Sequence, residues 1–485
     1  MKQFYNNFNY SRENMLVYKT NRAFSSKGFI FLLMVVLYAI YLLSLRASFS
    51  LDDSSVVRIS TLSSLVIFLI ELYYIKQKQG SYFTPTIIFL IAYYLFQNGQ
   101  LLLISFDIDI TNLIAYSLSD HTRDVAVFSG ISNVIAGFAA YIMILPPSSA
   151  LHHHRAWGNE KNIAGYIMFP LSISIVVAYI LLYYKVIAFL SGGYFAVRAF
   201  ESTIPEFIGI FDYFYFPFSL LIILYDSNRI HAKFISKLLI IWLLVIALCG
   251  NRTTGLAGIL TIAYVNFFCL QASKSFKNRG SLRWILFTGA GLAIIGLSVF
   301  IAHFRINRDN ETELGLIANF ISETGGSVTP LYTSMEVVPN QEPFLMGTGY
   351  FYSMVGGFLP SYLDFTGTIR EIVEKSRYSA RWHERYFGQY TWGLGFSLNA
   401  EAYANFGWAG LVAIFFVCCL IFYFLRFNHL NFRYKNEIYL SCVLLFLWAT
   451  LPRRDTYYIW NALFYAVFLI KIYLLIINKP RAYNY

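Results

Sequence analysis

Long apolar runs recur along almost the whole chain, and they restrict its possible folds more than any other feature of the sequence. A run of about 20 apolar residues is the length that an α-helix needs to cross the hydrocarbon core of a bilayer. Most of the segments between the runs are short and polar, as connections between neighbouring spans would be. The sequence therefore predicts an all-α fold, a polytopic bundle of transmembrane helices with about 12 spans.

The apolar runs form two groups on either side of one long polar segment. The expected spans lie near residues 28–49, 57–75, 83–104, 125–145, 164–190, 209–226, 235–249, 253–270, 284–303, 396–425, 438–451 and 457–477. We expect about nine spans in an N-terminal bundle, residues 1–303, and about three in a C-terminal segment, residues 396–485. Residues 304–395 form a large, partly helical loop, too polar to span the bilayer and too long for a simple connection. The short turn Gly250-Asn251-Arg252 also allows the two runs beside it to form a re-entrant hairpin.

The composition supports a membrane protein. Apolar residues make up 57% of the 485 positions and charged residues 13%, whereas soluble domains contain about 25% charged residues. The net charge of +11 comes mostly from Lys and Arg in short connections, where such residues orient spans rather than bind nucleic acid. The first apolar run begins at Gly28 and lacks a small-residue cleavage motif, so we expect it to remain as an anchor. The five cysteines lie in or beside apolar runs, so we expect neither a disulfide nor a metal site.

The basic residues also predict which side of the membrane each connection faces. With the N-terminus placed inside, Lys and Arg collect in every second connection and at both termini. The other short connections lean acidic, with Asp52, Asp53, Asp107 and Asp109 among their residues. Because cytoplasmic loops carry the excess of Lys and Arg, we expect both termini in the cytoplasm and the large loop on the outer side.

Several outer arginines run against this charge bias and need a reason. Arg252 lies at the outer end of one span, and Arg453 and Arg454 lie in a tight outer turn. Helical spacing aligns four arginines of the large loop on one stripe: Arg370, Arg377, Arg381 and Arg385. A guanidinium can fork onto two phosphate oxygens, so converging arginines suit a lipid-linked pyrophosphate. The structural alternative is contact with lipid headgroups, or ion pairs with Glu311, Glu313, Glu374 and Asp455.

Two outer residues are candidates for a general base. Glu401 begins a span, and an ionisable group at membrane depth is costly and therefore a functional candidate. His383 lies deep in the large loop, and its imidazole could accept a hydroxyl proton near neutral pH. The alternatives are an interfacial carboxylate paired with arginine and a solvated histidine. The pair Asp52-Asp53 is more simply explained as two acidic residues of a short loop. The candidates for stacking on sugar rings are Tyr386, Tyr390 and Trp392 of the large loop.

Together these segments resemble a known family. Residues 250–256 (GNRTTGL), 398–410 (LNAEAYANFGWAG) and 452–455 (PRRD) are similar to motifs of the O-antigen polymerases of the Wzy type. An Arg-x10-Gly pattern of that family also has counterparts in two outer loops. These counterparts are Arg198 with Gly209, and Arg377 with Gly388.

The resemblance implies a multi-pass enzyme of the bacterial inner membrane with a GT-C-like architecture and a periplasmic active site. Its reaction would move a growing glycan from undecaprenyl pyrophosphate onto a repeat unit on a second undecaprenyl-pyrophosphate carrier. The enzyme would be an inverting or retaining, metal-independent glycosyltransferase without a cofactor. Glu401 or His383 would be the catalytic base. Substrate would be bound by Arg252, Arg453, Arg454, Arg377, Arg198, Arg381 and Tyr403. A chain-length regulator and a flippase would be possible protein partners.

Three other functions remain compatible with parts of this pattern. An O-antigen ligase would share the large loop and the arginines but would use lipid A core as its acceptor. A polysaccharide flippase belongs to a different class, and such transporters typically show internal repeats that this sequence lacks. A structural or receptor protein would not need arginines at three separate span ends.

Overall fold

The computed structural model of the chain describes residues 26–108, 121–147, 160–225, 229–269, 296, 315–358, 368, 371–372, 396–431, 435–468 and 471. These residues are mostly helical, and none of them forms a β-strand. Eight of the described helices are long and apolar enough to cross a membrane, and residues 253–269 form a shorter apolar helix. The predicted all-α, polytopic fold is confirmed.

The helices follow the order of the apolar runs. The N-terminal helices are α2 (Ser26–Ala47), α3 (Asp53–Gln79), α4 (Pro85–Ser105), α5 (Thr122–Met143), α6 (Glu160–Thr203), α7 (Glu206–Tyr225), α8 (Arg229–Leu248) and α9 (Arg252–Tyr264). The described part of the predicted large loop holds α11 (Leu316–Gly325), α12 (Thr329–Val337) and α13 (Thr348–Phe358). The C-terminal helices are α16 (Leu398–Phe406), α17 (Gly410–Leu425), α18 (Lys435–Trp448) and α19 (Tyr457–Ala462). Apart from residue 296, the expected span at 284–303 lies outside the described residues.

Local chemistry accounts for several helix ends. The side chain of Asp52 accepts a hydrogen bond from the Ser55 backbone N–H at 3.1 Å and caps α3, which ends at Gly80 in the left-handed region. This contact supports the explanation of Asp52 as a residue of an ordinary short loop. Thr84 caps α4 ahead of a proline that suits the first helical turn.

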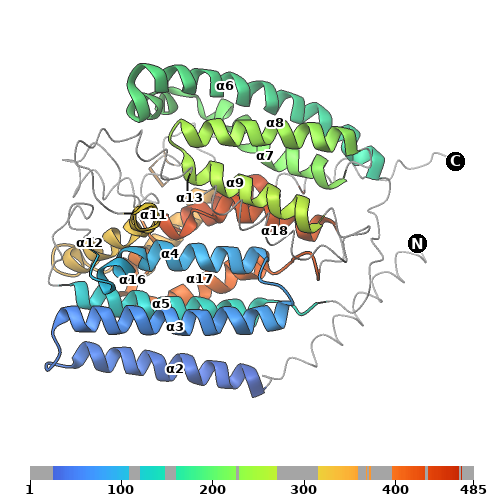
Figure 1. Cartoon of the computed structure of the whole chain (residues 1–485). Coiled ribbons are helices and arrows are strands. Elements are labelled where there is room, and N and C mark those ends of the chain that lie inside the picture. Colours follow the sequence, from blue (N-terminus) through green and yellow to red (C-terminus); the bar gives the residue numbers. More distant parts are fainter. Residues whose placement is uncertain are drawn as a thin grey trace.

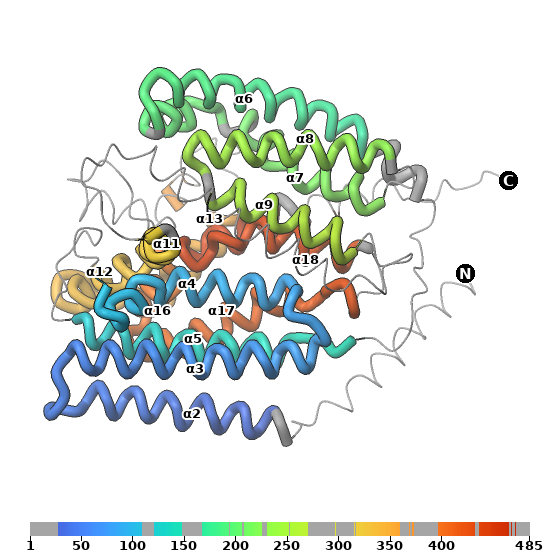
Figure 2. Tube along the Cα trace, in the orientation of Figure 1, coloured from blue at the N-terminus to red at the C-terminus, as the bar shows by residue number. Residues whose placement is uncertain are grey.

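The long helices pack side by side, as Figures 1 and 2 show. Between them, their buried side chains form two apolar cores. The first core draws its buried side chains mainly from α2, α3, α4, α5, α12, α16 and α17. The second draws them from α6, α7, α8, α9 and α18. The C-terminal helices are therefore interleaved with the N-terminal ones, since α17 completes the first core and α18 the second.

The expected span at 396–425 is a broken helix. Helix α16 ends at Phe406 and is followed by Gly407, whose φ of 58° lies in the left-handed region that favours glycine. Helix α17 begins at Gly410. A Cβ on Gly407 would meet the Phe344 ring at 3.1 Å, and one on Gly410 would lie 2.3 Å from the Ala402 carbonyl oxygen. The break leaves α16 as a short, buried helix at the same end of the bundle as α11 and α12, on the left in Figure 1.

Candidate functional site

An elongated cavity of about 290 Å³ lies between α4, α9, α11 and α18. Its walls are mostly aliphatic and aromatic, with Ile88, Phe89, Ile91, Ala92, Leu95, Phe96, Leu256, Ala257, Leu260, Phe320 and Leu445. Its polar lining consists of Thr253, Glu323, Thr324, Thr450 and Arg453. Since Thr253 lies in the first turn of α9 and Thr450 follows α18, the polar groups collect at one end of the cavity.

The depth of the cavity follows from helix geometry. The lining of α9 extends from Thr253 to Leu260 and that of α4 from Phe96 back to Ile88. At about 1.5 Å per residue, these stretches are about 10 and 12 Å long. The cavity is therefore amphipathic, with charged residues at one end, here called its mouth, and apolar walls along the membrane-spanning helices.

Arg453 is held at this mouth by a rigid turn. Its backbone carbonyl accepts a hydrogen bond from Phe396 N–H at 3.3 Å. The preceding Pro452 carbonyl accepts one from Gln97 Nε2 at 2.6 Å, which ties the turn to α4. The guanidinium of Arg454 stacks on the Tyr458 ring at 4.3 Å from its centroid. Arg453 thus lines the cavity mouth, whereas Arg454 stacks on Tyr458.

Glu401 lies beside the same turn but is enclosed by protein. Only 1% of the residue is exposed. Its carboxylate accepts hydrogen bonds from the Thr456 N–H and hydroxyl, both at 2.7 Å, and from the Ser353 hydroxyl at 3.3 Å. Glu401 therefore joins α16 to α13 and to the segment that follows the arginine turn.

The other polar residues of α16 also contact several neighbouring elements. The Asn399 amide accepts from the Tyr93 hydroxyl at 2.7 Å and donates to the Ser132 hydroxyl at 2.8 Å. The Asn405 side chain accepts from the Gly349 N–H at 3.2 Å. Tyr403 is buried, with its ring 5.7 Å from that of Phe128, and is not among the described residues that line the cavity.

The turn that contains Arg252 joins two tightly packed helices. A Cβ on Gly255 would lie 2.5 Å from the Leu243 carbonyl oxygen, so α9 approaches α8 more closely than another residue would allow. Arg252 is the first residue of α9 and precedes Thr253, which lines the large cavity. Asn251, on its other side, lines a separate small cavity on α6 and α8. The backbone of Arg252 therefore lies between the two cavities.

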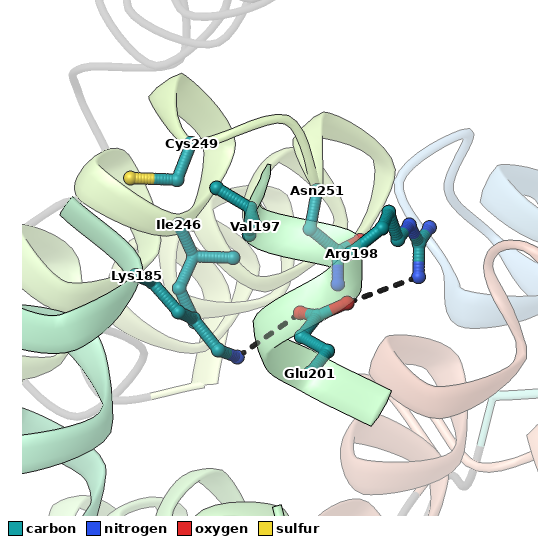
Figure 3. Close-up of a pocket in the computed structure, with 7 residues that line it drawn as sticks. All are labelled: Lys185, Val197, Arg198, Glu201, Ile246, Cys249 and Asn251. Atoms are coloured by element: carbon teal, nitrogen blue, oxygen red, sulfur yellow. Dashed lines mark hydrogen bonds and ion pairs between the residues drawn. The ribbon is translucent and has the colours of Figure 1, made fainter. Parts of the chain in front are cut away.

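The small cavity is built around a charged cluster that includes Arg198, as Figure 3 shows. Glu201 accepts from Lys185 at 3.2 Å and from Arg198 at 3.1 Å, and Lys185 also lies 3.7 Å from Asp212. Helix α6 is interrupted at Gly193, whose φ is 67°, before the segment that carries Arg198 and Glu201. The Arg198 side chain is 55% exposed.

The Cys249 side chain also lines this cavity.

The structure places the described site arginines around two cavities. Arg453 lines the large cavity, Arg198 lines the small one, and the backbone of Arg252 lies between them. Arg377, Arg381 and His383 lie outside the described residues.

Sequence reasoning overlooked Glu323. This carboxylate lines the large cavity together with Arg453. The only local signal was an acid shortly before the glycine pair of residues 325–326. That pattern did not distinguish Glu323 from the other acids of the large loop.

One comparison with known proteins shows the family of the chain. The family model of the O-antigen polysaccharide polymerase Wzy matches residues 27–481, which is nearly the whole chain. No curated protein and no solved structure matches the chain.

Proposed function

Because the chain belongs to the O-antigen polysaccharide polymerase family (Wzy), we propose that the large cavity and its arginines bind a glycan on undecaprenyl pyrophosphate. The family makes the protein a membrane-embedded, glycosyltransferase-type polymerase of polysaccharide biosynthesis. In the proposed reaction, the growing chain is transferred from its carrier to a repeat unit on a second undecaprenyl pyrophosphate.

The observation that carries this proposal is the amphipathic cavity. A polyprenyl pyrophosphate has a charged head and a long apolar tail, and the cavity has Arg453 at its mouth and apolar walls behind it. The first isoprene units fit along α4 and α9, and the rest of the tail continues into the bilayer. The head then lies where Arg453 and the start of α9 converge.

The proposed chemistry uses the arginines to stabilise the leaving group. The acceptor hydroxyl attacks the anomeric carbon, and the bond from that carbon to the pyrophosphate oxygen breaks. Negative charge grows on the pyrophosphate in the transition state, where fixed cations lower the barrier most. Arg453 and Arg252 supply these cations. Arg198 binds the glycan or pyrophosphate from the α6 side, and Arg377 and Arg381 contribute from the large loop.

We place the reaction at the periplasmic face of the bacterial inner membrane. The charge distribution supports this orientation, with both termini cytoplasmic and the large loop outside. A flippase would deliver the substrate to that face, and a chain-length regulator would act on the growing product.

Reconstitution of the purified protein tests the proposal. Undecaprenyl-pyrophosphate-linked repeat units from a strain that lacks this protein are added to proteoliposomes, and products are resolved on a gel. A ladder of lengthening glycans supports a polymerase. Transfer only to added lipid A core would instead identify a ligase, and transport without transfer a flippase.

Arginine variants test the assignment of the cavity. Arg453→Ala and Arg252→Ala are expected to reduce chain growth by about 100-fold or more, because each removes a fixed cation from the leaving group. Arg426→Ala is the control, since Arg426 follows α17 and stacks on Tyr423 at 3.9 Å, away from the cavity lining. Normal ladders from Arg453→Ala would contradict the assignment.

A further inference from the structure

Glu323 lines the mouth of the large cavity and has no role in the reaction proposed above. Of the described residues that line the cavity, Glu323 is the only one with a carboxylate and Arg453 the only one with a positively charged side chain. The two residues reach the mouth from different elements, α11 and the turn after α18. A transferase that joins a hydroxyl to an anomeric carbon needs a cation for the leaving group and a proton acceptor for the nucleophile.

The backbone that carries Glu323 is fixed against α4. A Cβ on Gly325 would lie 2.3 Å from the Gln100 backbone nitrogen and 2.7 Å from the Gly99 Cα, so the two helices meet at their backbones. The Gln100 side chain also donates to the Ser322 carbonyl at 3.2 Å. Glu323 lies between these two anchors, which hold its Cα while its half-buried side chain lines the cavity.

Two neighbouring carboxylates are far less accessible. Glu401 is 1% exposed and accepts three hydrogen bonds from Thr456 and Ser353, and Asp455 is fully buried. A hydroxyl proton can be transferred only to a group within hydrogen-bond reach of the acceptor sugar. Of these three acids, Glu323 is the one that lines the cavity in which we place the substrate.

We propose that Glu323 is a catalytic residue, the carboxylate that removes the proton from the acceptor hydroxyl. This inference rests on the proposed polymerase function. The proton passes from the hydroxyl to a Glu323 oxygen as the sugar oxygen bonds to the anomeric carbon. The bond from that carbon to the pyrophosphate breaks, and the electron pair leaves with polyprenyl pyrophosphate beside Arg453. Glu323 thus acts on the acceptor hydroxyl, and Arg453 acts on the leaving pyrophosphate.

The test measures chain growth and carrier binding separately in proteoliposomes. Glu323→Gln keeps the size of the side chain but removes the proton acceptor, so chain growth is expected to fall by about 100-fold or more. Binding of radiolabelled undecaprenyl pyrophosphate is expected to stay within threefold of wild type. Glu336→Gln is the matched control, because Glu336 is exposed on the neighbouring α12 and is absent from the described cavity lining.

Each outcome decides between the alternatives. A loss of growth below tenfold, or an equal loss of growth and carrier binding, would overturn the role of Glu323. Glu323→Asp retains a carboxylate and should keep more activity than Glu323→Gln; equal activities would also overturn it. If the wild-type protein forms no ladder, the result contradicts the polymerase proposal itself. If the wild-type protein forms a ladder and chain growth by Glu323→Gln is undiminished, the result contradicts the role of Glu323 alone.

Discussion

Replacement of Glu401 separates a structural role for this carboxylate from a chemical one. The Glu401 side chain accepts hydrogen bonds from the Thr456 N–H, the Thr456 hydroxyl and the Ser353 hydroxyl. In Glu401→Ala the two hydroxyls can rotate towards other acceptors, but the buried N–H cannot. An unsatisfied buried group costs about 1–3 kcal/mol, and the space left by the side chain adds about 1 kcal/mol. We therefore expect Glu401→Ala to lower the free energy of unfolding by about 3 kcal/mol.

Glu401→Gln is the informative comparison. The amide oxygen can accept from the Thr456 N–H while the amide nitrogen donates to the Thr456 hydroxyl oxygen, so we expect a loss of only about 1 kcal/mol. Thr456→Val removes the hydroxyl and keeps the N–H, and should cost a similar amount. If Glu401 only holds the arginine turn, Glu401→Gln keeps most of its chain growth and Glu401→Ala loses both growth and stability.

The assay combines unfolding in mixed detergent micelles with the ladder measurement. A Glu401→Gln protein of wild-type stability that forms no ladder would refute the structural reasoning and favour Glu401 as the proton acceptor. Equal stabilities of Glu401→Ala and wild type would show that the three hydrogen bonds do not hold the turn.

Three further predictions concern packing and charge. Gly325→Ala should push α11 away from α4 and reduce chain growth at least tenfold. Gly315→Ala is the control, because its Cβ would meet nothing within 4 Å, and it should leave the ladder unchanged. Equal ladders from the two variants would contradict the close approach of the α11 and α4 backbones. Ala92→Trp should block the cavity and reduce carrier binding, measured with radiolabelled undecaprenyl pyrophosphate, while Leu37→Trp on the exposed face of α2 should not. Lys185→Met removes the ammonium group that Glu201 and Asp212 share, and it should lower the free energy of unfolding by about 3 kcal/mol. Unchanged stability of this variant in detergent would contradict the prediction.

Much of the fold could be predicted from local sequence. Apolar runs of about 20 residues identify spans because lipid acts uniformly along a helix, and no partner needs to be known. The motif around Arg252 and the turn at Arg453 were also visible, since charged residues at span ends are rare enough to stand out. The segments 250–256 and 398–410 pointed to the family that the whole-chain match then showed.

The tertiary structure decided what these residues contact. Glu401 was predicted at a span end, but its burial depends on Thr456, 55 positions later in the chain, and on Ser353, 48 positions earlier. Glu323 resembles any other loop acid until α11 packs on α4 and places it in the lining of the same cavity as Arg453. Such contacts arise from helix packing and chain reversal, which leave no periodic signal in a single sequence. The sequence by itself therefore determined a helical membrane protein of this family with arginines at its span ends, whereas only the packed structure decided that one of those arginines shares an amphipathic cavity with a carboxylate.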